Sequence, residues 1–265
     1  MAKIVPAQWV AEQLEKSEIT IIDPRRPMKY LAGHLPGALN VPAFKLFGAD
    51  GRLLNSEELA QFIGRAGIGD AAPPLLLYDS PEGQNAAMLA WVLEYLGRND
   101  VHVMAEFAES WKAKGYEILY KPVEAPPLRL TPRINPTIRA DLEAVQPSTE
   151  VARDESLKLV DFRSREEFTG AQGIGHDPLG HIPGAVNIVW RELGSPSEGI
   201  LKSHDALEQM LKLAGIRRED DLVAYCRSGL RASLGYLALR EMGYRVRLFD
   251  GSYAEWSQAG LPVEK

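Results

Sequence analysis

The feature that most constrains the fold of this chain is an internal repeat, because a set of short motifs occurs twice in the same order. The first set is IIDPR (21–25), GHLPGALNVP (33–42), AGIGD (66–70), LLLYDS (75–80), EYLG (94–97) and Trp111. The second set is LVDFR (159–163), GHIPGAVNIV (180–189), AGIRRED (214–220), LVAYCR (222–227), REMG (240–243) and Trp256. The spacing agrees except for nine extra residues between Asp161 and Gly180. The repeat predicts two similar domains in tandem.

The stretch between the two copies, residues 120–137, contains five prolines. Prolines at this density exclude a long helix and favour an extended, semi-rigid connector. We therefore expect an N-terminal domain at 1–119, a proline-rich linker at 120–137 and a C-terminal domain at 138–265.

Within each copy, short apolar runs alternate with longer amphipathic patterns. Runs such as 75–79 and 222–225 are typical of buried strands. Residues 56–67 and 204–215 carry apolar side chains at helical spacing and close on a glycine suited to a left-handed helix end. This alternation predicts an α/β fold: a tandem of two domains, each a mostly parallel central sheet with helices on both faces.

Charge and hydropathy exclude several classes of partner. The net charge of the 265 residues is −6 and no block of like charges stands out, so we expect no nucleic-acid partner. No apolar run approaches the length of a membrane span, and Glu12 and Glu15 interrupt the start of the chain. We therefore expect a soluble cytoplasmic protein without a membrane partner.

Cys226 is the only cysteine, so an internal disulfide and a thiolate metal cluster are excluded. The repeat supplies a comparison for it, because CRSGLR (226–231) stands opposite DSPEGQ (79–84) in the first copy. The second copy thus has a thiol and two arginines where the first has two carboxylates and a proline. We expect the C-terminal domain to be catalytic and the N-terminal domain, with Asp79 in place of the cysteine, to be non-catalytic.

The surroundings of Cys226 suit a reactive thiolate. The residue follows a strand pattern and precedes a helical run, at the sheet edge where open α/β folds place their ligands. Gly229 allows the turn to point N–H groups inward, and the helix N-terminus adds partial positive charge. Arg227 and Arg231 add full charges, so the thiolate is favoured at neutral pH. The alternative is an inert buried cysteine, which slow alkylation near pH 7 would support.

Residues shared by both copies are better candidates for structure than for chemistry. Three residues of the second copy recur in the first: Asp161, Arg163 and His181 match Asp23, Arg25 and His34. We expect the two histidines, each within a G-H-x-P-G-A turn, to stabilise that turn.

No metal or cofactor is expected. His176 and His181 lie five apart but lack a third ligand, so solvated loop histidines are the better interpretation. The sequence has no G-x-G-x-x-G, G-x4-G-K-[ST] or H-E-x-x-H motif.

The combined motifs resemble the rhodanese family. They are D-x-R (161–163), G-H-x-P-G-A-x-N (180–187), C-R-S-G-x-R (226–231) and F-D-G-S (249–252) with a following tryptophan. The tandem layout, with cysteine only in the second copy, is similar to two-domain thiosulfate sulfurtransferases and 3-mercaptopyruvate sulfurtransferases. The likeness extends from about residue 5 to residue 262.

The resemblance implies a two-step sulfur transfer. Cys226 would take a sulfane sulfur from a small-molecule donor, hold it as a persulfide, and pass it to cyanide or a thiol. The N–H groups of the loop, from Cys226 through Ser228, Gly229 and Leu230 to Arg231, would hold the persulfide. Arg227 and Arg231 would bind the anionic donor. Arg163, by its match to the family's D-x-R arginine, would also face the donor; its counterpart Arg25 leaves a structural ion pair as the alternative.

The resemblance also guides the choice of donor. Cysteine-dependent phosphatases of this fold have C-x5-R, whereas the C-x4-R of Cys226 and Arg231 favours sulfur over phosphate. Mercaptopyruvate enzymes of the family resemble C-G-S-G-[VT] and carry a second arginine at the position of Glu167, whose carboxylate is expected to repel mercaptopyruvate. Arg227 matches the charged loops of thiosulfate enzymes, although Ser228 and Arg231 depart from their C-R-K-G-V-T pattern. Thiosulfate is the expected donor and mercaptopyruvate the alternative.

Two further questions stay open from sequence. The chain could be a sulfur carrier that delivers persulfide sulfur to a protein acceptor, using the same cysteine. Trp190, which follows the 186–189 strand pattern and has no tryptophan counterpart, could line the donor pocket or have a core or interface role.

Overall fold

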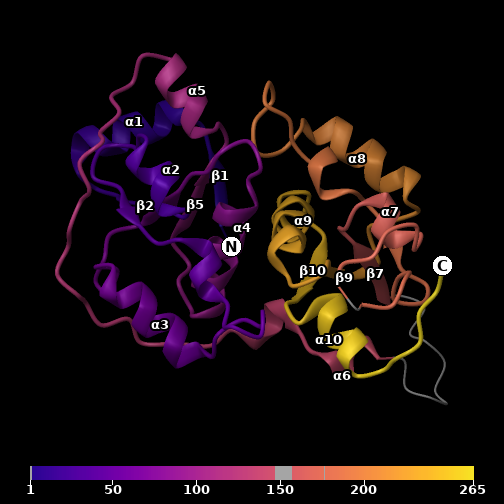
Figure 1. Ribbon diagram of the computed structural model, residues 1–265. Coiled ribbons are helices and arrows are strands. Elements are labelled where there is room, and N and C mark those ends of the chain that lie inside the picture. Colours follow the sequence, from indigo (N-terminus) through magenta and orange to yellow (C-terminus); the bar gives the residue numbers. More distant parts are fainter. Residues whose placement is uncertain (1, 147–156, 176) are drawn as a thin grey trace. The chain divides into compact units, whose positions relative to one another are not determined.

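The computed structural model describes residues 2–146, 157–175 and 177–265. The chain divides into two compact units (Figure 1). The first comprises Met1–Asn135 with Gly194–Leu201, and the second comprises Pro136–Leu193 with Lys202–Lys265. The segment 194–201 joins the first unit through Ile200, whose N–H donates to the carbonyl of Ala105.

The first unit contains a five-stranded parallel sheet. Its strands lie in the order β1 (Lys3–Val5), β5 (Val101–Met104), β4 (Leu75–Leu77), β2 (Thr20–Asp23) and β3 (Leu39–Asn40). The connecting helices are α1 (Ala7–Lys16), α2 (Pro27–Leu31), η1 (Ala43–Leu46), α3 (Ser56–Arg65), α4 (Gln84–Tyr95) and α5 (Ala108–Ala113).

The second unit repeats this topology. Its five parallel strands lie in the order β6 (Arg139–Ala140), β10 (Arg245–Phe249), β9 (Asp221–Tyr225), β7 (Leu157–Asp161) and β8 (Val186–Asn187). Its helices are η2 (Pro136–Ile138), α6 (Leu142–Val145), α7 (Arg165–Phe168), η3 (Trp190–Glu192), α8 (His204–Leu213), α9 (Leu230–Glu241) and α10 (Ser252–Gln258). The predicted tandem α/β fold is confirmed.

The helix ends follow from local chemistry. α3 begins after Asn55, whose side chain accepts the N–H of Glu58 while Glu58 returns a bond to the N–H of Asn55. α3 and α8 are each followed two residues later by a glycine at positive φ, Gly67 at 89° and Gly215 at 69°. The predicted helices at 56–67 and 204–215 are therefore real, and their last two positions form the turn that ends them.

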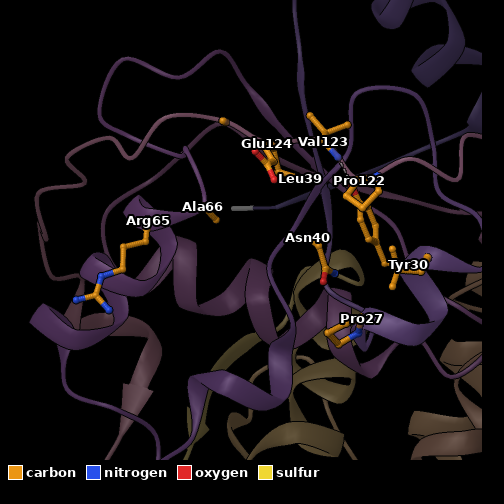
Figure 2. Close-up of a pocket in the computed structure, with 11 residues that line it drawn as sticks. Pro27, Tyr30, Leu39, Asn40, Arg65, Ala66, Pro122, Val123 and Glu124 are labelled. Carbon is orange, nitrogen blue, oxygen red and sulfur yellow. Dashed lines mark hydrogen bonds between the residues drawn. The ribbon is translucent and has the colours of Figure 1, made fainter.

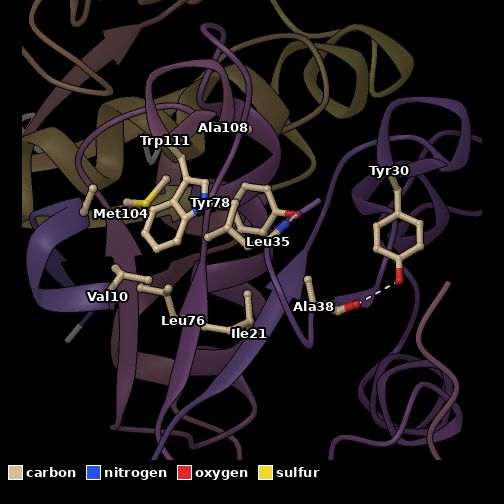
Figure 3. Packing of buried hydrophobic residues seen from close by; sticks show 11 residues of the cluster. Val10, Ile21, Tyr30, Leu35, Ala38, Leu76, Tyr78, Met104, Ala108 and Trp111 are labelled. Atoms are coloured by element: carbon tan, nitrogen blue, oxygen red, sulfur yellow. Dashed lines mark hydrogen bonds between the residues drawn. The ribbon is translucent and has the colours of Figure 1, made fainter. Parts of the chain in front are cut away.

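The repeated tryptophans are core residues. Trp111 packs in the first unit with Tyr78, Leu76 and Met104 (Figure 3), and Trp256 occupies a matching cluster in the second unit. Each indole N–H donates to a nearby carbonyl, Trp111 to Glu117 and Trp256 to Pro262. The motif tryptophan therefore serves packing in both copies.

Residues 120–135 of the proline-rich segment run without helix or strand along the first unit, and η2 begins at Pro136. The N–H of Leu128 donates to the carbonyl of Gly64, and the N–H of Arg133 donates to that of Leu96. A Cβ on Gly64 would lie 2.4 Å from the Leu128 carbonyl oxygen, so the close approach requires glycine.

In the part of the chain that the structure describes, no helix combines the length and apolar character needed to span a bilayer.

Candidate active site

Cys226 lies directly after β9, at the carboxyl end of the central strand of the second unit. It is buried, with 1% of its surface exposed. Its N–H donates to Ser252 Oγ at 3.2 Å, and its carbonyl accepts the N–H of Tyr253 at 3.0 Å. The start of α10 therefore holds the backbone of the cysteine in place.

In the loop that follows Cys226, backbone carbonyls are bonded to the adjoining helices, while the N–H groups of residues 227–231 stay available. The carbonyl of Arg227 accepts the N–H of Ala254, and that of Gly229 accepts the N–H of Ser233. Among the described residues, the N–H groups of 227–231 have no hydrogen-bond acceptor. Gly229 has φ 86°, a conformation that suits glycine, and immediately precedes α9. Free N–H groups at a helix N-terminus form an anion-binding cradle.

Ser252 is a site residue that the sequence reasoning missed. It is fully buried, and its Oγ both accepts the Cys226 N–H and donates to the Phe249 carbonyl at 2.7 Å. Its φ is 53°, a strained value for a residue other than glycine. The sequence signal that could have identified Ser252 is its place in F-D-G-S, a motif that begins at the last residue of β10 and lies at the same edge of the sheet as Cys226. Phe107 holds the corresponding position in the first unit. The N–H of Ala108, the next residue, donates to the carbonyl of Asp79, just as the N–H of Tyr253 donates to the carbonyl of Cys226.

Arg231 faces Cys226 and forms a two-pronged ion pair with Glu167. Its Nη1 donates to Glu167 Oε2 at 2.5 Å and its Nη2 donates to Oε1 at 2.9 Å. Burial by itself would lower the pKa of Arg231, but the bonds to Glu167 and the charge of Cys226 raise it above its ordinary value. The sequence suggested that the Glu167 carboxylate repels mercaptopyruvate; in the structure this carboxylate is not free, because Arg231 compensates its charge.

Arg227 also has a carboxylate partner, but at a more open position. Its Nε donates to Asp177 Oδ2 at 2.8 Å, and 38% of the Arg227 side chain is exposed. The pair is partly exposed, because 18% of the Asp177 side chain is also accessible, and solvent screening makes it weaker than a fully buried pair. Arg227 is therefore the arginine of the loop that an incoming anion can reach with least rearrangement.

Arg163 is held in a buried fork. Its Nε and Nη2 donate to Asp161, its Nη2 also donates to the carbonyl of Gly180, and its guanidinium lies 3.9 Å from the centre of the Tyr253 ring. Arg25 makes the same contacts with Asp23 and Gly33 in the unit without a thiol. Of the two roles that the sequence left open for Arg163, these contacts favour the structural ion pair.

The histidines of the repeated turn also make matching structural contacts. His34 Nδ1 bonds to the carbonyl of Tyr30, and His181 Nδ1 bonds to that of Phe168; each imidazole stacks on the same partner's ring. His176 lies outside the described residues. No group of three or more potential metal ligands occurs among the residues that the structure describes.

Trp190 is buried in η3, with 6% of its surface exposed, and Arg191 lies over its ring. This places it in the core of the second unit, which is one of the roles that the sequence left open for it.

The corresponding loop of the first unit is filled by its own side chain. The carboxylate of Asp79 accepts the backbone N–H groups of Ser80, Asn85 and Ala86 and the Asn85 side-chain amide. Burial raises the pKa of Asp79 to about 6 although these bonds oppose the shift. The loop is one residue longer than that of Cys226, because α4 begins after Gly83 and α9 after Gly229. The ungapped pairing of the two loops was therefore wrong beyond Asp79, and Asn85 corresponds to Arg231.

A cavity of about 460 Å³ lies in the first unit between α2, the end of α3 and the proline-rich segment (Figure 2). Its lining includes Pro27, Tyr30, Asn40, Arg65, Val123 and Glu124. It contains no nucleophile, and none of its lining residues belongs to the second unit.

Comparison with known proteins places these features in context. The model of the rhodanese-like domain matches residues 6–114 and again 148–259. The sulfur carrier protein TtuD of Thermus thermophilus is 30% identical over 99% of this chain and 96% of its own length. A thiosulfate sulfurtransferase of Corynebacterium glutamicum is 28% identical over 99% of this chain and 90% of its own. The crystal structure of SseA from Escherichia coli, described as a 3-mercaptopyruvate sulfotransferase, superposes with a TM-score of 0.83 and 26% identity, covering 95% of this chain and 99% of that one.

Proposed function

This chain belongs to the rhodanese family and is a sulfurtransferase, and from that premise we propose that Cys226 carries a sulfane sulfur from thiosulfate to cyanide or a thiol. The observation that carries the proposal is the pairing of this single buried cysteine with a loop whose N–H groups have no acceptor in the described chain. Such a loop can hold one additional anionic atom on the thiol, as a persulfide requires.

In the first step the Cys226 thiolate attacks the outer sulfur of thiosulfate. A new S–S bond forms, the bond between the outer sulfur and the sulfonate sulfur breaks, and sulfite leaves with the electron pair. The N–H groups of residues 227–231 hold the resulting persulfide anion. Arg227, at the open edge of the loop, receives the donor, and Arg231 lies beside the sulfur that is transferred.

In the second step the acceptor attacks the outer sulfur of the persulfide. Cyanide leaves as thiocyanate, or a thiolate leaves as a persulfide, and the Cys226 thiolate is regenerated. Electrons and charge balance in both steps, so neither step needs an external oxidant or reductant. The first unit, with Asp79 in place of the cysteine, takes no part in the covalent chemistry.

A second candidate function is a persulfide carrier that serves a protein acceptor. The specific observation in its favour is that Arg163, Arg227 and Arg231 each hold a carboxylate, so the site carries little uncompensated charge for a small dianion. The relative named as a sulfur carrier also supports it. Faster transfer to Cys226 from a protein persulfide than from thiosulfate would favour the carrier.

Intact-mass measurement after incubation with thiosulfate tests the proposal. We expect the protein to gain one sulfur atom, which cyanide removes and Cys226→Ala abolishes. Absence of this adduct from the folded protein would refute the function with thiosulfate. An adduct that persists in Cys226→Ala would move the chemistry to another residue.

A further inference from the structure

The charges around Cys226 are arranged in compensated pairs. The three arginines of the proposed site each contact one carboxylate: Arg163 with Asp161, Arg227 with Asp177, and Arg231 with Glu167. The first of these pairs is repeated in the first unit and therefore belongs to the fold. The other two pairs involve Arg227 and Arg231, loop residues that differ between the copies. We therefore connect the charge compensation in these two pairs with the function of the second unit rather than with the fold.

Of the two carboxylates that pair with the loop arginines Arg227 and Arg231, Glu167 is more firmly held than Asp177. Its exposed fraction is 7%, and both of its oxygens bond to Arg231. Its Oε2 also accepts the N–H of Ser164, while Ser164 Oγ accepts the N–H of Glu167, so α7 fixes the carboxylate from its other side. Burial alone would raise the pKa of Glu167, but Arg231 lowers it below the usual range, so the carboxylate is ionised at neutral pH.

We propose that Glu167 is a positioning residue that determines donor specificity: it holds Arg231 beside Cys226 and cancels its charge, so that the site favours singly charged sulfane donors over the thiosulfate dianion. The proposal rests on the proposed function and specifies its substrate class. Donors of this class include organic persulfides and thiosulfonates, which carry one negative charge on the transferable sulfur. Thiosulfate remains a substrate, but the Arg231–Glu167 pair offers no uncompensated positive charge to stabilise its second negative charge.

The physical reason is the charge dependence of the Coulomb energy. Removing one negative charge near the donor stabilises a dianion about twice as much as a monoanion at the same place. The effect is larger at Glu167 than at an exposed position, because water and salt screen a buried charge less. Replacing the Glu167 carboxylate by an amide should therefore change the ratio of activities toward two donors of different charge.

The test compares thiosulfate, which carries two negative charges, with methanethiosulfonate, which carries one. Both donors transfer a sulfane sulfur. In each enzyme we take the ratio of kcat/KM for thiosulfate to kcat/KM for methanethiosulfonate, so that intrinsic donor reactivity cancels between variants. Glu167→Gln should raise this ratio by roughly three- to tenfold, mainly through a lower KM for thiosulfate. Arg231→Gln, which leaves Glu167 uncompensated, should lower the ratio by a similar factor.

Glu166→Gln is the matched control, because Glu166 precedes Glu167 on α7 and is exposed. It removes the same charge without touching Arg231 and should change the ratio by less than about twofold. A ratio that stays unchanged in both Glu167→Gln and Arg231→Gln overturns the proposal, as does an equal change in Glu166→Gln. If Glu167 only stabilises the fold, Glu167→Gln lowers Tm and reduces both activities by one factor, which also refutes it. Failure of the proposed function itself is distinct, since the wild-type protein would then form no Cys226 persulfide with thiosulfate.

Discussion

Asp79 and Cys226 occupy the same point of the two units, since each follows the central strand of its sheet and precedes a buried twelve-residue helix. Their loops differ in how the N–H groups are used. In the first unit the Asp79 carboxylate accepts them, whereas in the second unit the N–H groups of 227–231 have no acceptor within the described ranges. One loop is closed by its own side chain, and the other is free to hold a persulfide.

Asp79→Ala should leave sulfur transfer within about twofold of wild type and destabilise the first unit. The variant leaves the N–H groups of Ser80, Asn85 and Ala86 without their acceptor, which costs about 1–3 kcal/mol of the free energy of unfolding. Urea unfolding and steady-state kinetics measure the two effects. Loss of turnover in a variant that stays folded would contradict a non-catalytic first unit.

Asp79 should also make the stability of the protein depend on pH. Its folded-state pKa of about 6 lies above the ordinary value of 3.8, so the folded state binds the proton more tightly. The stabilisation from protonation is complete below pH 3.8 and is lost as the pH rises through 6. The free energy of unfolding should fall over this window by at most about 3 kcal/mol on account of this group.

Unfolding of wild type and Asp79→Asn across pH 4 to 7 isolates this contribution, because only the wild type titrates at residue 79. Parallel curves for the two proteins would show that Asp79 keeps an ordinary pKa in the folded state.

Ser252→Ala should impair both folding and turnover. It leaves the Cys226 N–H without the Ser252 Oγ acceptor and the Phe249 carbonyl without its donor, a loss of about 1–3 kcal/mol. Displacement of the nucleophile should lower kcat/KM about tenfold. Ser252→Gly should be more stable than Ser252→Ala, because glycine adopts φ 53° without strain. Equal stability of the two variants would argue against strain at this residue.

Arg163→Lys and Arg25→Lys form a matched pair that separates structure from donor binding. Lysine cannot reproduce the fork to Asp161 or Asp23, so each variant should lose about 2–4 kcal/mol of stability. If Arg163 serves the fold, its variant should change the KM for thiosulfate no more than Arg25→Lys does. A KM that rises more than about tenfold in Arg163→Lys alone would assign this arginine to donor binding.

Much of the fold could be predicted because it depends on local patterns. The apolar runs that precede Asp79 and Cys226 are strands, and the two amphipathic stretches that end at Gly67 and Gly215 are helices. The repeat allowed each pattern to be checked against a second copy. The loop pairing failed because an ungapped comparison cannot detect the single additional residue before α4.

The candidate site could be predicted only in part. Cys226 and its loop are contiguous, so residue types and spacing were enough to single them out. The partners of the loop arginines are distant in sequence: Glu167 is 64 residues from Arg231, and Asp177 is 50 residues from Arg227. No periodicity connects such positions, and the acidic residues looked like free charges until the fold paired them.

The sequence by itself determined the two-unit α/β fold and which unit carries the thiol, because these depend on hydrophobic periodicity, glycine positions and residue types within short segments. Only the tertiary structure decided what charge a donor meets beside Cys226. That charge depends on Glu167 of α7 and Asp177 of the following loop, which pair with the arginines of the cysteine loop. A Coulomb interaction depends on distance in space rather than on separation along the chain.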